Sequence, residues 1–139
     1  MPDTDHLHLE DTTPWIRRWL RAEGIAAFVG AAAGWWALGG EWIWFAVLML
    51  APDIAMLGYL GGSHLGAIAY NIAHNWFVGG IVLGAGLALN VPGLAFAGLI
   101  LIAHTGGDRA LGYGLKYPTS FQDTHLGRIG RIGRIGRRL

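Results

Sequence analysis

The chain has 139 residues, of which 53% are hydrophobic and only 14% are charged, whereas soluble domains carry about 25% charged residues. All ten Lys and Arg residues lie before Gly24 or after Gly107, and the only acidic residues between those glycines are Glu41 and Asp53. A stretch of that length without a basic residue excludes a water-facing globular surface, so lipid is the expected solvent. The lack of Cys excludes disulfide and thiolate chemistry.

The N-terminal part of the chain predicts a disordered segment followed by a long helix. Residues 1–14 are polar and show no apolar periodicity. Thr13 and Pro14 form a helix-start pattern, because threonine caps the first N–H groups and proline suits the first helical position. A helix is therefore expected over residues 15–38, long enough to span about 30 Å of hydrocarbon only if it includes the turn bearing Glu23.

Three more helices are expected, with short turns between them. Each turn is rich in Gly, Asn or Pro. Pro52 should kink the first of these, over residues 42–60, and release a backbone carbonyl. Short connections force neighbouring helices to run antiparallel, so residues 15–111 predict an all-α, integral membrane, up-down four-helix bundle. Its four spans are residues 15–38, 42–60, 64–89 and 94–111.

Glycines recur at helical spacing within the predicted spans. Gly30 and Gly34 are four residues apart, as are Gly80 and Gly84. Small residues at this spacing let helix backbones approach closely in lipid, so these pairs predict helix–helix contacts.

The C-terminal part predicts a juxtamembrane loop over residues 112–126 and a basic tail over residues 127–139. The tail repeats Gly-Arg-Ile three times. It is expected to rest on anionic headgroups at about 1 kcal/mol per charge, or simply to set the topology, and nucleic-acid binding is not expected. Because basic residues flank the first and last spans, the positive-inside rule places both termini in the cytoplasm.

Five ionisable residues are expected at one depth within the bilayer. Counted from the outer end of each helix at 1.5 Å per residue, they all lie about 16–22 Å down, in the cytoplasmic half. Ionisable groups inside a membrane are costly and usually functional. The set, to which every predicted helix contributes, is Glu23, Asp53, His74, His104 and Asp108.

The types and spacing of these residues point to three kinds of chemistry. His104 and Asp108 are four residues apart and share a helix face, as do Tyr70 and His74, with Asn71 beside them. Imidazole and carboxylate groups at one level suit a divalent metal such as zinc, iron or manganese. The same groups, with Asp53, His74, His104 and Asp108 as the catalytic candidates, can relay protons or act as general acid and base. Hydrogen bonds that merely join helices are the structural alternative.

The loop over residues 112–126 is rich in Gly and Tyr and should not continue the last helix. It leaves that helix on the side where the ionisable residues lie. It is therefore expected either to fold back as a lid that carries Lys116, Asp123 and His125, or to anchor the chain at headgroup level through its aromatic residues.

A set of short segments between about Arg18 and Gly127 forms a distinctive combination. The segments are Arg21-Ala22-Glu23-Gly24, Ala51-Pro52-Asp53, Met56-Leu57-Gly58-Tyr59, Tyr70-Asn71 with His74, Ala103-His104 with Asp108-Arg109, Leu111 to Tyr117, and Thr124 to Gly127. In these segments the chain resembles a family of small bacterial membrane proteins known as domain of unknown function 4260. The resemblance implies a multi-pass protein of the bacterial cytoplasmic membrane and carries no activity with it.

Taken together, the sequence predicts a membrane-embedded His/carboxylate site that binds a metal or performs acid–base chemistry on an amphiphilic substrate. Two other functions remain open: a proton-coupled transporter or channel, and a structural or accessory membrane subunit. Because four short helices enclose little volume, a homo-oligomer is also expected. The sequence does not decide whether the protein is an enzyme.

Overall fold

Helices account for almost all of the secondary structure in the computed structural model, which describes residues 14–129. The predicted disordered N-terminal residues and most of the predicted basic tail therefore lie outside the described residues. The chain is all-α, as expected, apart from one very short hairpin. In chain order the elements are α1 (Pro14–Ala37), α2 (Trp42–Leu48), the 3₁₀-helix η1 (Ala51–Gly61), α3 (Ser63–Ala73), α4 (Trp76–Ala88), α5 (Pro92–Leu111), β1 (Asp123–Thr124) and β2 (Gly127–Arg128).

Two of the predicted spans are each broken into two helices. The span expected over residues 42–60 is divided into α2 and η1, because Pro52 has no N–H to continue the helical hydrogen bonds. The span expected over residues 64–89 is divided at His74 and Asn75. His74 leaves the helical conformation (φ −112°, ψ 41°), and the side chain of Asn75 caps α4 by accepting a hydrogen bond from the backbone N–H of Phe77 at 2.8 Å.

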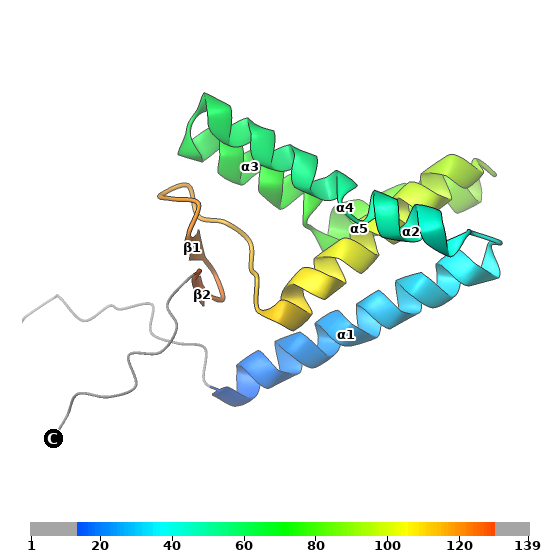
Figure 1. Cartoon of the computed structure of the whole chain (residues 1–139), viewed down its shortest axis with the longest axis horizontal. Helices are drawn as coiled ribbons and strands as arrows, with labels where there is room; N and C mark the ends of the chain where they lie inside the picture. The colour runs from blue at the N-terminus through cyan, green and yellow to red at the C-terminus, as the bar shows by residue number, and fades with distance from the viewer. Residues whose placement is uncertain (1–13, 130–139) are drawn as a thin grey trace, which may run out of the picture.

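These breaks change the arrangement from the predicted up-down four-helix bundle. Helix α5 packs against α1 on one side and against α4 on the other, whereas η1 packs against α3 as a separate hairpin. Figure 1 shows that this hairpin points away from the α4–α5 pair, and that the two breaks meet near the middle of the molecule. A continuous helix could not turn its second half in a new direction, so the breaks set this layout.

A close helix contact joins α1 and α5 through two glycines. A Cβ atom on Gly24 would lie 2.7 Å from the backbone oxygen of Gly106, and one on Gly106 would lie 2.7 Å from the backbone oxygen of Gly24. The antiparallel crossing also brings the start of α1 beside the end of α5, where Arg21 lies next to Gly112. Glycine is required at both crossing positions because any side chain would overlap backbone atoms.

Of the four glycines whose spacing predicts helix–helix contacts, only Gly34 lies close to another helix. A Cβ atom on Gly30, Gly80 or Gly84 would meet nothing within 4 Å, so the predicted contacts at these positions are wrong. Gly34 does face a neighbour, since its Cβ would lie 3.0 Å from Leu99. The prediction fails because glycine spacing identifies a helix face but does not say which face meets another helix.

The core is small and lies between α1, α2 and α5. Trp35 is its largest member, and its ring meets Phe45 at 5.4 Å and Phe96 at 4.7 Å between ring centroids. Many large hydrophobic side chains lie outside this core. Exposed ones occur on every helix, for example Trp19, Ile43 and Phe77.

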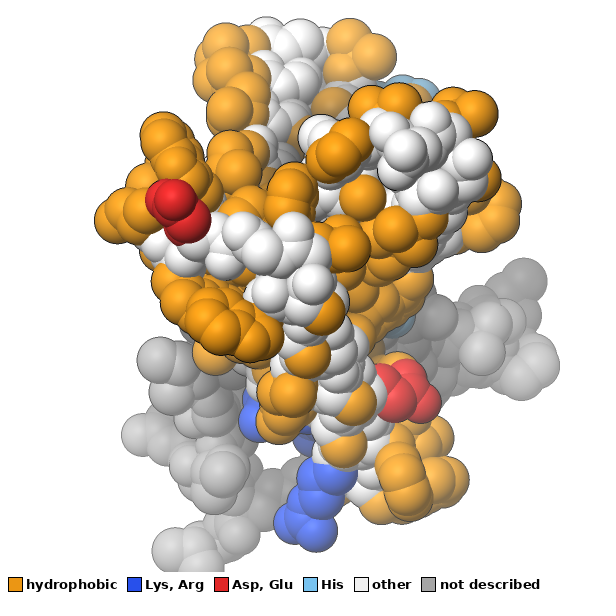
Figure 2. Space-filling view, turned by 90° about the vertical axis from the view of Figure 1, so that its right-hand side faces the viewer, with side chains coloured by type: hydrophobic (Ala, Val, Ile, Leu, Met, Phe, Trp, Pro, Cys, Tyr) orange, Lys and Arg blue, Asp and Glu red, His pale blue; other side chains and the backbone are white. Residues whose placement is uncertain are grey.

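The surface is divided between a large apolar region and a basic end. Figure 2 shows hydrophobic side chains over most of one face, with the Lys and Arg side chains gathered at one end. Within residues 14–129, one helical stretch, Trp42–Gly61, is long and apolar enough to cross a membrane, and only 11% of its apolar window is buried. Such low burial distinguishes this stretch from the core helix of a soluble protein, which would be covered by its neighbours.

Residues 112–129 form a C-terminal strap that returns from α5 toward α3. Gly112 ends α5 in the left-handed conformation (φ 94°), which glycine adopts without strain. The strap is held by the β1–β2 pair, in which Asp123 faces Arg128, and by a bridge between Lys116 and Thr124. Figure 1 shows the strap on the side of the molecule where α5 ends and the η1–α3 hairpin begins to project.

Candidate metal centre

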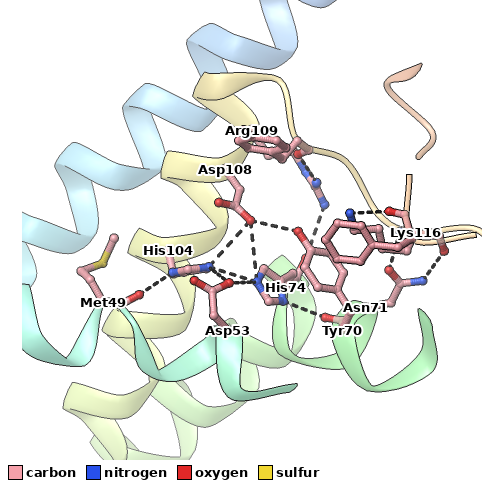
Figure 3. Close-up of polar contacts among 11 residues, drawn as sticks. Met49, Asp53, Tyr70, Asn71, His74, His104, Asp108, Arg109 and Lys116 are labelled. Atoms are coloured by element: carbon pink, nitrogen blue, oxygen red, sulfur yellow. Dashed lines mark hydrogen bonds and ion pairs between the residues drawn. The ribbon is translucent and has the colours of Figure 1, made fainter. Parts of the chain in front are cut away.

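Four ionisable side chains from three parts of the chain converge at the two helix breaks. Asp53 comes from η1, His74 from the end of α3, and His104 and Asp108 from one face of α5. The Nε2 atoms of His74 and His104 lie 3.0 Å apart, and Asp53 Oδ1 lies 3.4 and 3.3 Å from them. Asp108 Oδ2 lies 3.7 Å from each of the same two nitrogen atoms. Figure 3 shows these groups pointing toward one another.

The other ring nitrogen of each histidine contacts a backbone carbonyl. His74 Nδ1 lies 2.8 Å from the carbonyl oxygen of Tyr70, and His104 Nδ1 lies 2.5 Å from that of Met49. A carbonyl oxygen can only accept, so each Nδ1 carries the proton and donates it. In the neutral rings both Nε2 atoms therefore present bare lone pairs to each other and to the two carboxylates, which is the tautomer that metal-ligating histidines adopt.

The separations between the four inward-facing atoms match those of a coordination shell. With bonds of about 2.0–2.1 Å, neighbouring ligands of a tetrahedral zinc ion lie about 3.3 Å apart. The five separations given above fall between 3.0 and 3.7 Å. Three of the residues, Asp53, His74 and His104, each offer one ligand atom, and these three atoms all lie within 4.8 Å of one another. These three side chains could therefore hold one divalent ion, and Asp108 lies beside them.

Tyr70 orients two members of the cluster. Its hydroxyl donates to Asp108 Oδ2 at 3.0 Å, and its ring stacks on the His74 imidazole with 3.7 Å between centroids and 10° between planes. Partners of this kind fix the direction of a ligand and commonly change metal affinity by about 10–100-fold. The helical spacing of Tyr70 and His74 predicted their shared face, but not the hydrogen bond to α5.

The cluster also satisfies the backbone groups that the helix breaks release. The Met49 carbonyl lies three residues before Pro52, which has no N–H to offer it, and His104 takes that place. The carbonyl of His74 accepts a weaker hydrogen bond from the buried Arg109 guanidinium at 3.4 Å. The site and the irregular backbone thus stabilise each other, as unpaired buried carbonyls would be costly.

Arg109 is a buried residue beside the cluster that the sequence analysis did not single out. It was expected to be an ordinary basic residue flanking the last span, yet it is only 5% exposed and also donates to the carbonyl of Tyr113 at 2.7 Å. Arg109 therefore joins the α3 break to the start of the strap. Its position directly after Asp108, on a helix that ends at Leu111, was the available signal.

The strap is attached to α3 by Asn71 and Lys116. The side chain of Asn71 donates to the Lys116 carbonyl at 2.8 Å and accepts from the Lys116 N–H at 2.6 Å. The Lys116 ammonium donates to the Phe121 carbonyl at 2.7 Å and lies 5.0 Å from the centre of the Tyr70 ring. Burial lowers the pKa of Lys116, and the nearby Asp108 carboxylate opposes that shift. Lys116 therefore contacts Tyr70, which in turn donates a hydrogen bond to Asp108 of the cluster.

The remaining predicted site residues lie away from the four converging side chains. Glu23 is exposed on α1, a helix that contributes none of the four converging side chains. Asp123 accepts a hydrogen bond from Thr119 at 2.8 Å within the strap. His125 Nδ1 accepts from the Leu115 N–H at 2.8 Å, and burial followed by repulsion from Arg109 lowers its pKa. The helix rise gives a residue's position along its helix, but it could not tell which side of α1 faces α5.

Comparison with known proteins identifies a family. No curated protein and no solved structure matches the chain. A family model described as a domain of unknown function (DUF4260) matches residues 17–129, which include all four converging side chains and the whole strap. The match covers most of the chain and agrees with the resemblance seen in the sequence. This chain therefore belongs to the DUF4260 family.

Proposed function

We propose that this chain is an integral membrane protein with a divalent-metal centre formed by Asp53, His74, His104 and Asp108. The centre would perform metal-assisted acid–base chemistry on an amphiphilic substrate. The observation that carries the proposal is the convergence of two imidazole lone pairs and two carboxylate oxygens, with both rings held in the ligating tautomer by backbone carbonyls. Two nitrogen and two oxygen ligands suit zinc, iron or manganese.

Insertion in a membrane is supported by the surface and by the positions of charge. Helix α1 has 24 residues and is about 36 Å long, which exceeds the roughly 30 Å of a hydrocarbon core. Exposed tryptophans lie near both ends of the helical region, with Trp15 and Trp19 at one end and Trp42 and Trp44 at the other. Tryptophan favours the membrane interface. Irregular backbone at membrane depth is tolerated where protein covers it, as at the second break, where His74 is fully buried.

Within the proposed centre, the buried histidines would hold the ion, and the more exposed Asp53 would meet the substrate. Bound there, a divalent ion supplies Lewis acidity for polarising a carbonyl or phosphoryl oxygen. His74 and His104 are buried and hold position. Asp53 has a side chain that is 44% exposed, against 19% for Asp108, so the accessible side of the centre lies at Asp53. The free oxygen of Asp53 is the one best placed to accept a proton from an incoming group.

Elemental analysis is the direct test of the metal centre. Protein purified in mild detergent without chelator is expected to contain about one zinc, iron or manganese ion per chain, because Asp53, His74 and His104 each offer a ligand atom and Asp108 lies beside them. Removing the ion with a chelator should lower the melting temperature, and adding it back should restore it. Protein that contains no divalent ion and cannot be loaded to this stoichiometry would contradict the proposal.

Cysteine labelling tests the membrane topology, because the chain has no Cys of its own. Glu41 lies in the α1–α2 turn and Tyr117 lies in the strap, and both are exposed. In intact bacterial cells, Glu41→Cys is expected to react with a membrane-impermeant maleimide, whereas Tyr117→Cys should react only after the cells are opened. Equal reactivity of both positions before and after opening would contradict the orientation in which the basic end is cytoplasmic.

A proton relay is the second candidate, and one observation favours it. The 3.0 Å separation of the two Nε2 atoms is also a hydrogen-bond length, so a single shared proton could replace the metal. In that case the protein would purify without metal and would move protons across vesicle membranes. Elemental analysis and proton flux in liposomes therefore separate the two functions.

A further inference from the structure

An apolar groove lies along the face of α5 that carries His104 and Asp108 further along the helix. It has a volume of about 900 Å³ and lies between the α1–α2 turn, α2, η1 and α5. Gly93, Ala97, Ile100 and Leu101 of α5 line it. These positions recur every three or four residues, and the next members of the series are His104 and Asp108. One face of a single helix is thus apolar along the groove and polar at its end.

Two other lining residues are direct chain neighbours of residues of the centre. Pro52 lines the groove and precedes Asp53, and Ala73 lines it and precedes His74. From Gly93 to His104 the helix rises about 16 Å, so the apolar part is long and the polar part lies at one end. Its volume falls within the roughly 300–1,000 Å³ typical of small-molecule sites.

We infer that the substrate is a lipid with a single long apolar chain, which occupies this groove while its polar group lies at the His/Asp centre. The inference rests on the proposed function and adds the substrate class to it. The direction of the groove also fits a lipid of the cytoplasmic leaflet. Its polar end faces the basic end of the molecule, and its apolar end runs toward the α1–α2 turn at the opposite end of α1.

Photolabelling with two probes tests the groove and the polar end separately. The first probe is hexadecanol with a photoreactive diazirine at mid-chain, which has no charge to interact with a metal. It is expected to label groove residues such as Trp44 and Leu101 with or without metal. In Ala97→Phe the new ring fills the groove floor, and groove labelling should fall by about tenfold or more, the loss expected when a bound chain is excluded.

Ala33→Phe is the matched control, because Ala33 is exposed on α1 and does not line the groove. It should label like the unaltered chain. Labelling spread evenly over the exposed apolar surface, or unchanged groove labelling in Ala97→Phe, would overturn the inference. This result does not depend on whether metal is bound, so it is distinguishable from failure of the metal centre.

The second probe is the corresponding hexadecanoic acid, whose carboxylate can reach the centre. Metal-loaded protein should reach half-maximal groove labelling at about tenfold lower probe concentration than metal-depleted protein, since a cation replaces the repulsion from Asp53 and Asp108. Metal-loaded protein that shows no such difference would overturn the placement of the polar group at the centre.

Discussion

Replacing His74 with alanine is expected to abolish stoichiometric metal binding. The change removes one of four ligand atoms and the ring against which Tyr70 stacks. Losing the partner of a ligand commonly lowers affinity by about 10–100-fold, so losing a ligand itself should lower it by more. The measurement is metal content per chain after purification, followed by titration of the depleted protein with zinc or manganese.

Two further variants separate loss of the ligand from loss of the fold. His74 is fully buried, so its removal also leaves a cavity. Asp53→Asn keeps the size of a side chain that is 44% exposed and removes only its charge, so it should fold normally and still bind metal weakly. His64→Ala is the matched control, because His64 is exposed at the start of α3 and should retain full metal content.

Stability gives an independent measure of the same centre. A ligand that binds only the folded chain stabilises it by about 4 kcal/mol when its concentration is 1,000 times its dissociation constant. Chelation should therefore lower the melting temperature of the unaltered chain and of His64→Ala, but not that of His74→Ala. Equal metal content and an equal response to chelation in all three proteins would show that His74 is not a ligand.

Alanine substitutions at two glycines of α1 are expected to change stability in opposite directions. A Cβ atom on Gly24 would lie 2.7 Å from backbone atoms of Gly106 and Ala110, so Gly24→Ala must push α1 away from α5. Overpacking of this kind costs about 1–3 kcal/mol. At Gly30 nothing lies within 4 Å, and alanine favours the helix over glycine by about 1 kcal/mol. Gly30→Ala should therefore be neutral or stabilising.

Thermal unfolding in detergent, followed by tryptophan fluorescence, measures both variants. The two substitutions are chemically identical and lie six residues apart on one helix, so general effects of alanine cancel between them. Gly24→Ala should also weaken metal binding, because Arg109 lies at the crossing and holds the His74 carbonyl. Equal melting temperatures for the two variants would refute the close α1–α5 crossing.

Much of the candidate site could be predicted from the sequence because few positions were available. Ionisable residues are scarce in the apolar region, and the helix rise alone put Asp53, His74, His104 and Asp108 at similar depths. The same estimate included Glu23, which is exposed in the structure. Depth along a helix follows from counting residues, whereas the direction of a side chain depends on which neighbour the helix meets.

The breaks in the second and third predicted spans show a similar division. Pro52 predicts the first break, since proline within a helix removes a backbone hydrogen bond. The second break, at His74 and Asn75, has no proline, and the run of apolar residues around it reads as one continuous helix. The carbonyl of His74 accepts a hydrogen bond from Arg109, which lies 35 residues further along the chain. The sequence around His74 gives no indication of a hydrogen-bond donor so far away in the chain.

The sequence by itself determined that the chain is helical and apolar, where its turns lie, and which residue types meet at one depth. These properties follow from composition, from turn-forming residues and from the fixed rise of a helix. Only the tertiary structure decided that α5 lies between α1 and α4, that Gly24 faces Gly106, and that both histidines turn their Nε2 atoms inward. Those outcomes depend on contacts between residues far apart in the chain, where packing and backbone carbonyls select one side-chain direction among several that local structure permits.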